Sequence, residues 1–133
     1  MKLNKIPLLL LIATLLYSCD PGQILEIKVA NKQHLSVMIY GNGNILPHSS
    51  DKNEKVVLRV PSTDTSNDYD RTFIYRIGTW GDDAIFKFSN NIDSIILNTS
   101  SGKTIMSKKG EINKYLLQHR NGTLENILTI EVN

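Results

Sequence analysis

The stretch from Ile24 to Tyr40, ILEIKVANKQHLSVMIY, decides the fold of this chain. Every second residue is apolar on both sides of its polar centre. The alternating apolar residues are Leu25, Ile27 and Val29 in the first half and Leu35, Val37 and Ile39 in the second. A period of two residues is typical of β-strands that bury one face. The sequence therefore predicts strands at 24–30 and 35–40, joined by Asn31-Lys32-Gln33 as a hairpin or short meander.

Further strand patterns follow this stretch at spacings near ten residues, separated by turns rich in Gly and Asn. The predicted strands are Lys55–Val60, which Pro61 ends, then Thr72–Ile77, Ala84–Ser89, Asp93–Asn98 and Lys103–Met106. In AIFKFS (84–89), Phe86 and Phe88 alternate with Ile85 and Lys87, which favours a strand there as well.

The C-terminal segment carries two competing signals. Ile112, Tyr115, Leu116 and His119 have the i, i+3, i+4, i+7 spacing of one helical face. Asn121-Gly122, however, is a strong hairpin signal between two runs that contain apolar residues. We therefore expect a short helical turn near 111–115, followed by a terminal hairpin. In the last run of this hairpin, alternate apolar residues would share one face: Leu124, Leu128, Ile130 and Val132.

Many short strands with little helix indicate an all-β fold, most simply an antiparallel β-sandwich over residues 24–133. A small eight-stranded β-barrel is the alternative. At most one short helix is expected in either case.

The first residues differ from the rest in composition. Lys2 and Lys5 precede an apolar run from Ile6 to Leu16, which is shorter than the roughly 20 residues needed to span a bilayer. A basic start followed by an apolar run of this length is typical of a secretory signal peptide.

The end of this run, Leu16-Tyr17-Ser18-Cys19, resembles the lipobox of bacterial lipoproteins. In that family the cysteine thiol receives a diacylglyceryl group, and a peptidase cuts immediately before the cysteine. The resemblance implies a signal peptide at 1–18, a lipidated Cys19, and a tether at 19–23 that anchors the domain to a membrane. The alternative is an ordinary signal peptide cut elsewhere, with Cys19 discarded or left as a free thiol.

The layout also resembles that of small Bacteroidetes lipoproteins, in which a lipobox cysteine precedes an Ig-like β-sandwich. The matching stretches are Ser18-Cys19-Asp20, Asp93-Ser94-Ile95-Ile96-Leu97, Tyr115-Leu116-Leu117, Thr123-Leu124-Glu125-Asn126 and Leu128-Thr129-Ile130. This resemblance implies a lipid anchor in the cell envelope, at the outer membrane, on its periplasmic or surface face. Asp93-Ser94-Ile95 resembles the O-glycosylation site of exported proteins in that phylum, which implies a glycan on Ser94.

Composition limits the function. Once Lys2 and Lys5 are set aside with the leader, thirteen basic residues balance thirteen acidic ones. A neutral domain lacks the basic patch that nucleic-acid binding requires, so we expect no nucleic-acid partner. Cys19 is the only cysteine; with its thiol used for lipid, none is left for a disulfide or a nucleophile.

Catalytic and metal-binding patterns are weak. His34, His48 and His119 show no zinc-ligand spacing, and no Gly-x-Ser-x-Gly presents a nucleophilic serine. Alternate oxygen-bearing side chains in residues 62–71 fit a calcium loop less well than a solvated loop, because the glycine and glutamate of an EF-hand are missing. We therefore expect no metal, no cofactor and no enzyme activity.

Trp80 is the candidate binding residue, because it lies between Gly78 and Gly81 in a short loop. With Asp82 or Asp83 it would stack on a sugar ring or anchor a protein partner, with Tyr75 and Tyr40 as possible neighbours. The alternative is that its indole packs into the core. The sequence thus predicts a non-catalytic, lipid-anchored module that binds protein or assembles in the envelope. A carbohydrate-binding accessory module comes second, and a small hydrolase third.

Overall fold

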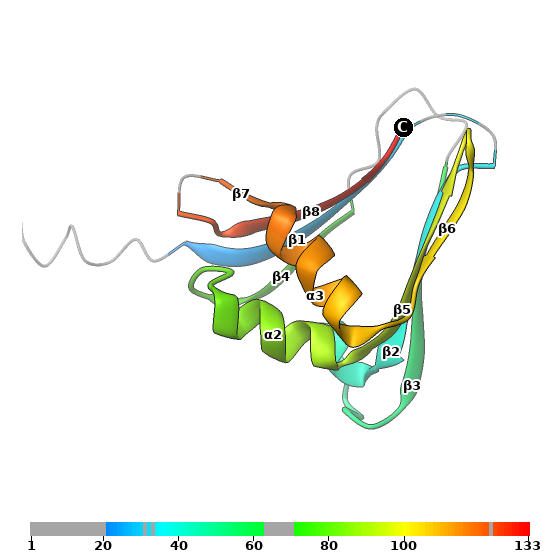
Figure 1. The fold of residues 1–133 in the computed structure, drawn as a ribbon. Helices are drawn as coiled ribbons and strands as arrows, with labels where there is room; N and C mark the ends of the chain where they lie inside the picture. Colours follow the sequence, from blue (N-terminus) through cyan, green and yellow to red (C-terminus); the bar gives the residue numbers. More distant parts are fainter. Residues whose placement is uncertain (1–20, 31, 33, 63–70, 123) are drawn as a thin grey trace, which may run out of the picture.

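The computed structural model describes residues 21–30, 32, 34–62, 71–122 and 124–133. These residues form two four-stranded sheets, and two α-helices pack beside them (Figure 1). The strands are β1 (Gly22–Val29), β2 (Ser36–Asn42), β3 (Lys55–Pro61), β4 (Arg71–Ile77), β5 (Ile92–Thr99), β6 (Gly102–Met106), β7 (Arg120–Asn121) and β8 (Ile127–Val132). The helices are the 3-10 turn η1 (Gly43–Ile45), α2 (Asp82–Asn90) and α3 (Lys109–Gln118).

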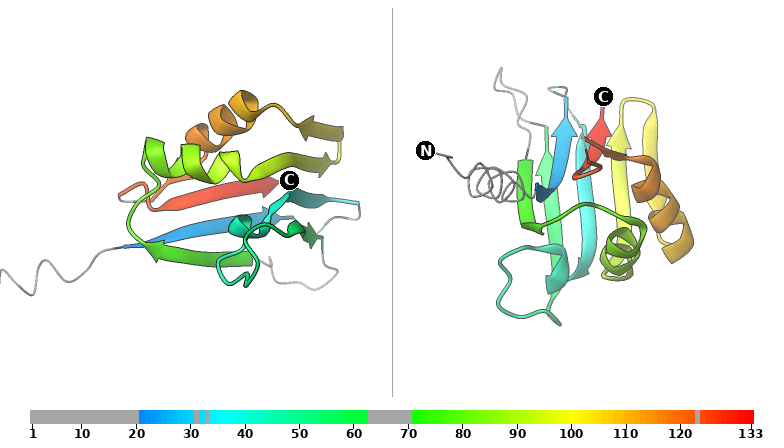
Figure 2. Two further views of the ribbon diagram at one scale, coloured as in Figure 1. Left: turned by 90° about the horizontal axis from the view of Figure 1, so that it is seen from below. Right: turned by 90° about the vertical axis from the view of Figure 1, so that its left-hand side faces the viewer.

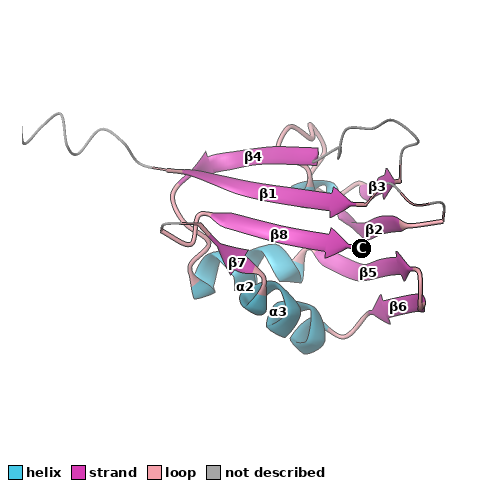
Figure 3. Cartoon of the chain, turned by 90° about the horizontal axis from the view of Figure 1, so that it is seen from above, coloured by secondary structure: helices cyan, strands magenta, loops and turns pink. Residues whose placement is uncertain are grey.

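One sheet has the order β4-β1-β8-β7 and the other β3-β2-β5-β6. Figure 3 shows the first sheet from above, with β4, β1 and β8 side by side. The two helices lie against each other beside the sheets (Figure 2). The predicted mostly-β fold with two sheets is therefore confirmed. Both sheets are open in the described part of the chain, so the closed-barrel alternative is wrong there.

The alternating pattern that predicts the first strands also predicts the core. All six inward positions of the opening stretch are buried, as are Leu128, Ile130 and Val132 of β8. Leu124, predicted to share the face of those β8 residues, lies before the strand and is 57% exposed. The alternation of buried and exposed residues thus holds within these strands and does not extend into the loop before β8.

The predicted hairpin between the first two strands is wrong, because β1 and β2 lie in different sheets. β1 instead pairs with β4 antiparallel and with the C-terminal β8 in parallel, with Ile24 opposite Ile127 and Val29 opposite Val132. A parallel neighbour requires a long crossover, and here all the chain from β2 to β7 forms it. The sandwich is therefore not wholly antiparallel.

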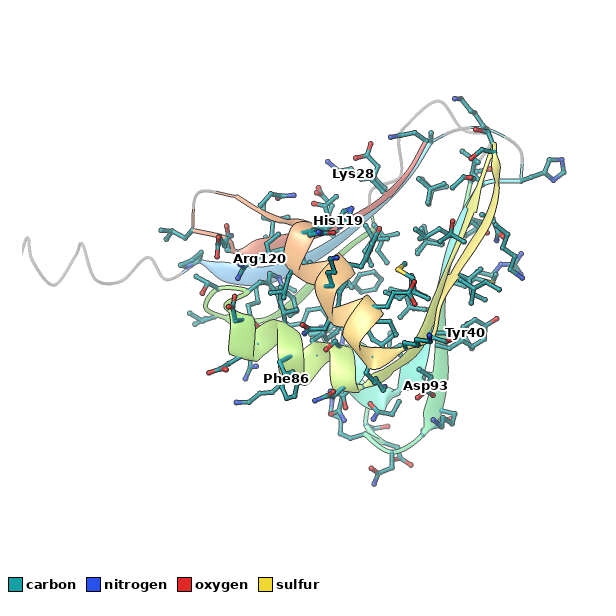
Figure 4. The ribbon with its side chains drawn as sticks, viewed as in Figure 1. Lys28, Tyr40, Phe86, Asp93, His119 and Arg120 are labelled. Atoms are coloured by element: carbon teal, nitrogen blue, oxygen red, sulfur yellow. The ribbon has the colours of Figure 1, made fainter. Side chains whose placement is uncertain are left out.

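The predicted strand at 84–89 is also wrong, because these residues lie in α2. Ile85, Phe88 and Ser89 are buried at i, i+3 and i+4, whereas Phe86 is 59% exposed. In Figure 4, Phe86 lies on the side of α2 that faces away from the sheets. Two aspartates in the first turn favour this helix, since negative charge is stabilising at a helix N-terminus.

The predicted helical turn near 111–115 is part of the ten-residue α3, which buries Ile112 and Leu116. The structure thus has two α-helices where at most one was expected. The terminal hairpin is confirmed in a shorter form, with Asn121 opposite Ile127. The turn is not at the predicted Asn121-Gly122, because Asn121 belongs to β7 and residues 122–126 connect the two strands.

Gly22 and Gln23, predicted to belong to the tether, are the first residues of β1. Residues 1–20 lie outside the described part of the structure, and so do the predicted leader and Cys19. Within the described residues, no helix is long and apolar enough to cross a membrane.

A close backbone approach at Gly41 gives a test of the packing between β2 and the end of α2. A Cβ at this position would lie 2.2 Å from the carbonyl oxygen of Asn91, whereas a Cβ at Gly110 would have no neighbour within 4 Å. We expect Gly41→Ala to lower the free energy of unfolding by about 1–3 kcal/mol, as overpacking does. Gly110→Ala, in α3, should raise it by about 0.5–1 kcal/mol. Urea unfolding followed by circular dichroism measures the free energy of unfolding of both variants. Equal changes in the two variants would contradict the close approach at Gly41.

Candidate functional site

Trp80 lies in the core, with a side chain that is 2% exposed. Its indole Nε1 donates a hydrogen bond to the carbonyl of Ile24 (2.8 Å), and its backbone N–H donates to the carbonyl of Glu125 (2.8 Å). This is the buried position that the core alternative predicts. Trp80 therefore joins the loop before α2 to β1 and to the β7–β8 loop.

Tyr75 and Phe88 complete an aromatic cluster around Trp80. The ring centroids are 5.6 Å apart for Tyr75 and Trp80, 5.4 Å for Tyr75 and Phe88, and 5.2 Å for Trp80 and Phe88. The first two pairs have the edge-to-face geometry that aromatic rings favour. The Tyr75 hydroxyl donates to the carbonyl of Ile45 (2.6 Å), and burial raises the pKa of this hydroxyl above its ordinary value. The predicted neighbour Tyr40 is on β2 and takes no part in these ring contacts.

Asp82 and Asp83 are exposed in the first turn of α2. Asp82 accepts a hydrogen bond from Arg120 Nη1 (2.7 Å), and the same Arg120 nitrogen lies 3.3 Å from Glu125 Oε2 and 3.2 Å from the carbonyl of Trp80. Figure 4 shows Arg120 directly after α3. The structure therefore gives Asp82 a partner that holds α2 to the terminal hairpin.

A hollow with a volume of about 260 Å³ lies beside the aromatic cluster. Its walls come from the start of β1, from β4, from α2, and from the loop that follows β2. The lining residues are Gln23, Asn44, Leu46, Pro47, Lys52, Tyr75, Arg76, Trp80, Ala84, Lys87, Phe88 and Asn91. Trp80 thus contributes to the floor of this hollow, whereas Asp82 and Asp83 are not among its residues.

Charge in the hollow is of one sign. Lys52, Arg76 and Lys87 line it and no acidic residue does. None of the three forms an ion pair with a carboxylate of the described residues. Arg76 donates through Nε to Gln23 Oε1 (3.1 Å), which orients its guanidinium.

The amide groups of the hollow are held by a local network. Asn91 Oδ1 accepts hydrogen bonds from Asn42 Nδ2 (3.1 Å) and Asn44 Nδ2 (3.3 Å), and Asn91 Nδ2 donates to the carbonyl of Lys87 (2.8 Å). Gln23 Nε2 donates to the carbonyl of Thr79 (2.5 Å). The Asn91 bonds link the end of α2 to the residues that end and follow β2, and the Gln23 bond links the start of β1 to the loop before α2.

The other predicted site residues lie elsewhere. Ser94 is half-buried on β5 opposite Tyr40 of β2, next to Asp93, whose pKa is lowered by a hydrogen bond from Lys55. His34, His48 and His119 belong to three separate segments, and His119 stacks on Tyr115. Among the residues that the structure describes, no three His, Cys, Asp or Glu side chains gather around a metal position. Residues 63–70, which belong to the predicted solvated loop, lie outside those residues, as does Cys19.

Sequence reasoning missed Arg76, Lys87 and the amides of the hollow. Arg76 lies within the predicted strand Thr72–Ile77. Lys87 lies within the predicted strand at 84–89, which is in fact helix α2. The helical spacing of Ile85, Phe88 and Ser89 was the available signal, because it places Lys87 away from the buried face. The contribution of Asn44 depends on a loop path that no local pattern specifies.

No family model matches this chain, and no curated protein or solved structure matches it either.

The buried position of Trp80 gives a direct prediction for stability. Trp80→Ala should lower the free energy of unfolding by about 3–5 kcal/mol, because it removes a large buried ring. Phe86→Ala on the exposed side of α2 is the control, and should change it by no more than about 0.5 kcal/mol. Chemical denaturation followed by circular dichroism compares the two. A fully stable Trp80→Ala protein would show that the indole is not part of the core.

Proposed function

We propose that this chain is a non-catalytic binding module of the cell envelope, anchored to the outer membrane by a lipid on Cys19. The described domain supplies the binding surface, and the two sheets form a sandwich of the Ig-like kind in architecture. The observation that carries the binding function is the hollow beside Trp80, whose residues combine cations, amides and an aromatic floor.

The composition of the hollow favours binding over catalysis. General acid–base chemistry needs titratable groups in contrasting environments near the reacting atoms. The hollow contributes Lys52, Arg76, Lys87 and the buried hydroxyl of Tyr75, and that hydroxyl already donates to the carbonyl of Ile45. A hydrolase would need a carboxylate, histidine or activated hydroxyl there, so the small-hydrolase alternative has the least support.

The hollow suits a small group better than a large apolar side chain. Its volume is near the lower limit of ordinary small-molecule sites, which are about 300–1,000 Å³. It would admit one sugar ring or one charged side chain of a partner protein. Asn44 makes its side-chain hydrogen bonds through Nδ2 and offers Oδ1 to a hydroxyl group, which favours carbohydrate as the second candidate beside a protein partner.

Exposed apolar side chains support a membrane-anchored position. They surround the start of β1, and they are Ile74 (61% exposed), Ile77 (71%) and Leu124 (57%). Gly22 pairs with Ile77, Gly78 N–H donates to the carbonyl of Pro21 (2.7 Å), and Asn126 Nδ2 donates to the carbonyl of Gly22 (3.3 Å). Figure 1 shows the start of β1, the end of β4 and the β7–β8 loop at this same end, which we call the tether end.

The tether is too short to move this end far from a lipid on Cys19. β1 begins at Gly22, and three chain steps from Cys19 reach at most about 11 Å. Apolar side chains at the tether end would then lie at the membrane interface, where burial from water is favourable. The exposure of these residues therefore has a physical reason in the proposed location.

Mass spectrometry of the mature protein tests the anchor. Expression in a bacterial host that processes lipoproteins should give an N-terminal peptide that begins at Cys19 and carries acyl chains. Cys19→Ser should abolish both the lipid and membrane retention, because the thiol is the attachment point. A mature N-terminus elsewhere, or an unmodified Cys19 thiol in the wild-type protein, would contradict the proposal.

An environment-sensitive dye tests the orientation. In the lipidated protein reconstituted in vesicles, a dye on Leu124→Cys should shift its emission to the blue relative to the soluble domain. The control is Ile105→Cys, which is similarly exposed (54%) but lies on edge strand β6 of the other sheet. Lipidated Cys19 is blocked, so only the new thiol reacts. Equal spectra at the two positions would contradict a membrane contact at the tether end.

A further inference from the structure

We propose that the hollow binds a monosaccharide-sized ligand that carries a carboxylate, such as a uronic acid at the end of a glycan. This inference rests on the proposed binding function of the hollow and specifies its ligand class. It is carried by the one-sided charge of the hollow, its volume and its amide wall.

The charge argument is the strongest. Three cationic residues from three segments line the hollow: Lys52 from the loop after η1, Arg76 from β4 and Lys87 from α2. Elsewhere in the described domain, Lys55 and Arg120 pair with carboxylates. In the hollow the positive charges have no such counter-charge among the described residues. All three residues are exposed, and an anion bound in the hollow would be attracted by each of them, less strongly at high ionic strength.

Arg76 supplies the geometry that selects a carboxylate. Its Nε donates to Gln23 Oε1, and Gln23 is 4% exposed and is itself held by the carbonyl of Thr79. This hydrogen bond orients the planar guanidinium, while its two terminal nitrogens stay available to a ligand. Guanidinium and carboxylate groups form paired parallel hydrogen bonds, which are stronger than bonds between neutral groups.

The size and the remaining walls favour a sugar ring behind this carboxylate. A volume of about 260 Å³ admits a single ring. Asn44 can accept a hydrogen bond from a ring hydroxyl through Oδ1, because its hydrogen bonds within the described residues are made through Nδ2 and the backbone. Trp80 is too deeply buried to stack its full face on a ring, since only 2% of it is exposed. Recognition therefore depends on charge and hydrogen bonds, with the aromatic cluster serving as a rigid floor.

Titration with glucuronate and glucose tests the ligand class, because the two sugars differ only in a carboxylate replacing a hydroxymethyl group. Trp80 is the only tryptophan and lines the hollow, so its fluorescence reports on binding. Glucuronate should bind at least about tenfold more tightly than glucose, the ratio that one charge-assisted hydrogen bond provides. Raising the ionic strength from about 0.01 M to about 1 M should weaken glucuronate binding, because the Debye length falls from about 30 Å to about 3 Å.

Substitutions locate the binding. Lys87→Gln should weaken glucuronate binding about three- to tenfold, and Arg76→Gln by at least as much. Lys103→Gln is the matched control, because Lys103 is exposed on β6 and does not line the hollow. Circular dichroism of each variant checks that the fold is retained. Equal losses of glucuronate affinity in Lys87→Gln and Lys103→Gln would show that glucuronate is attracted non-specifically to surface charge, and would overturn the site.

Each remaining outcome of the titration has a distinct meaning. Equal affinity for glucuronate and glucose would overturn the anionic ligand class and leave the proposed binding function standing. Equal affinity for inorganic phosphate and glucuronate would show that the anion alone is recognised, and would overturn the sugar. If no sugar and no phosphate binds at millimolar concentration, the inference of an anionic sugar ligand is overturned, and the proposed binding function is left with a protein partner only.

Discussion

The parallel pairing of β1 with β8 is the constraint on which the rest of the structure depends. It places two strands separated by nearly the whole chain side by side in the centre of one sheet. Leu25, Ile27, Leu128 and Ile130 are all fully buried there, and burying such side chains contributes about 1.5–3 kcal/mol each. Because these contacts join the two ends of the domain, the other sheet and both helices must form between them. The β7–β8 loop is thereby brought to the start of β1, where Trp80 donates hydrogen bonds to the carbonyl groups of Ile24 on β1 and Glu125 in the loop.

Trp80 connects this strand pairing to the hollow. Its Nε1 bonds to the Ile24 carbonyl on β1, its backbone N–H bonds to the β7–β8 loop, and its own carbonyl accepts from Arg120. The loop before α2 is thus fixed to the first sheet, and α2 can start only from that position. Arg76 on β4 and Lys87 on α2 then face one hollow. Trp80 is thus a core residue that also lines the hollow.

The sequence predicts burial within strands well, because alternation is a local pattern: the inward residues of β1, β2 and β8 were all identified. It does not predict which strands are neighbours, since ILEIKVA and LSVMIY fit a hairpin as well as two separate sheets. Alternation also misled at Ala84–Ser89, where Phe86 and Phe88 fit a strand, although Ile85, Phe88 and Ser89 have helical spacing. Of the candidate site, Trp80 was found because it is a single large aromatic residue between glycines. Arg76, Lys87 and Gln23 were not, because only the tertiary structure brings them together.

The proposed tether also restricts what can reach the hollow. Gln23 lines the hollow and is only four residues after Cys19, so at most about 14 Å of chain separates the two. If Cys19 carries the lipid, this part of the wall lies close to the membrane surface. A large folded partner that entered the hollow would then press against the bilayer, whereas a single sugar or the end of a flexible glycan would not. A short tether and a ring-sized hollow therefore favour the same kind of ligand, although they are independent features of the chain. The cations strengthen this preference, since an anionic group leaves water for the hollow only where positive charge replaces its hydration.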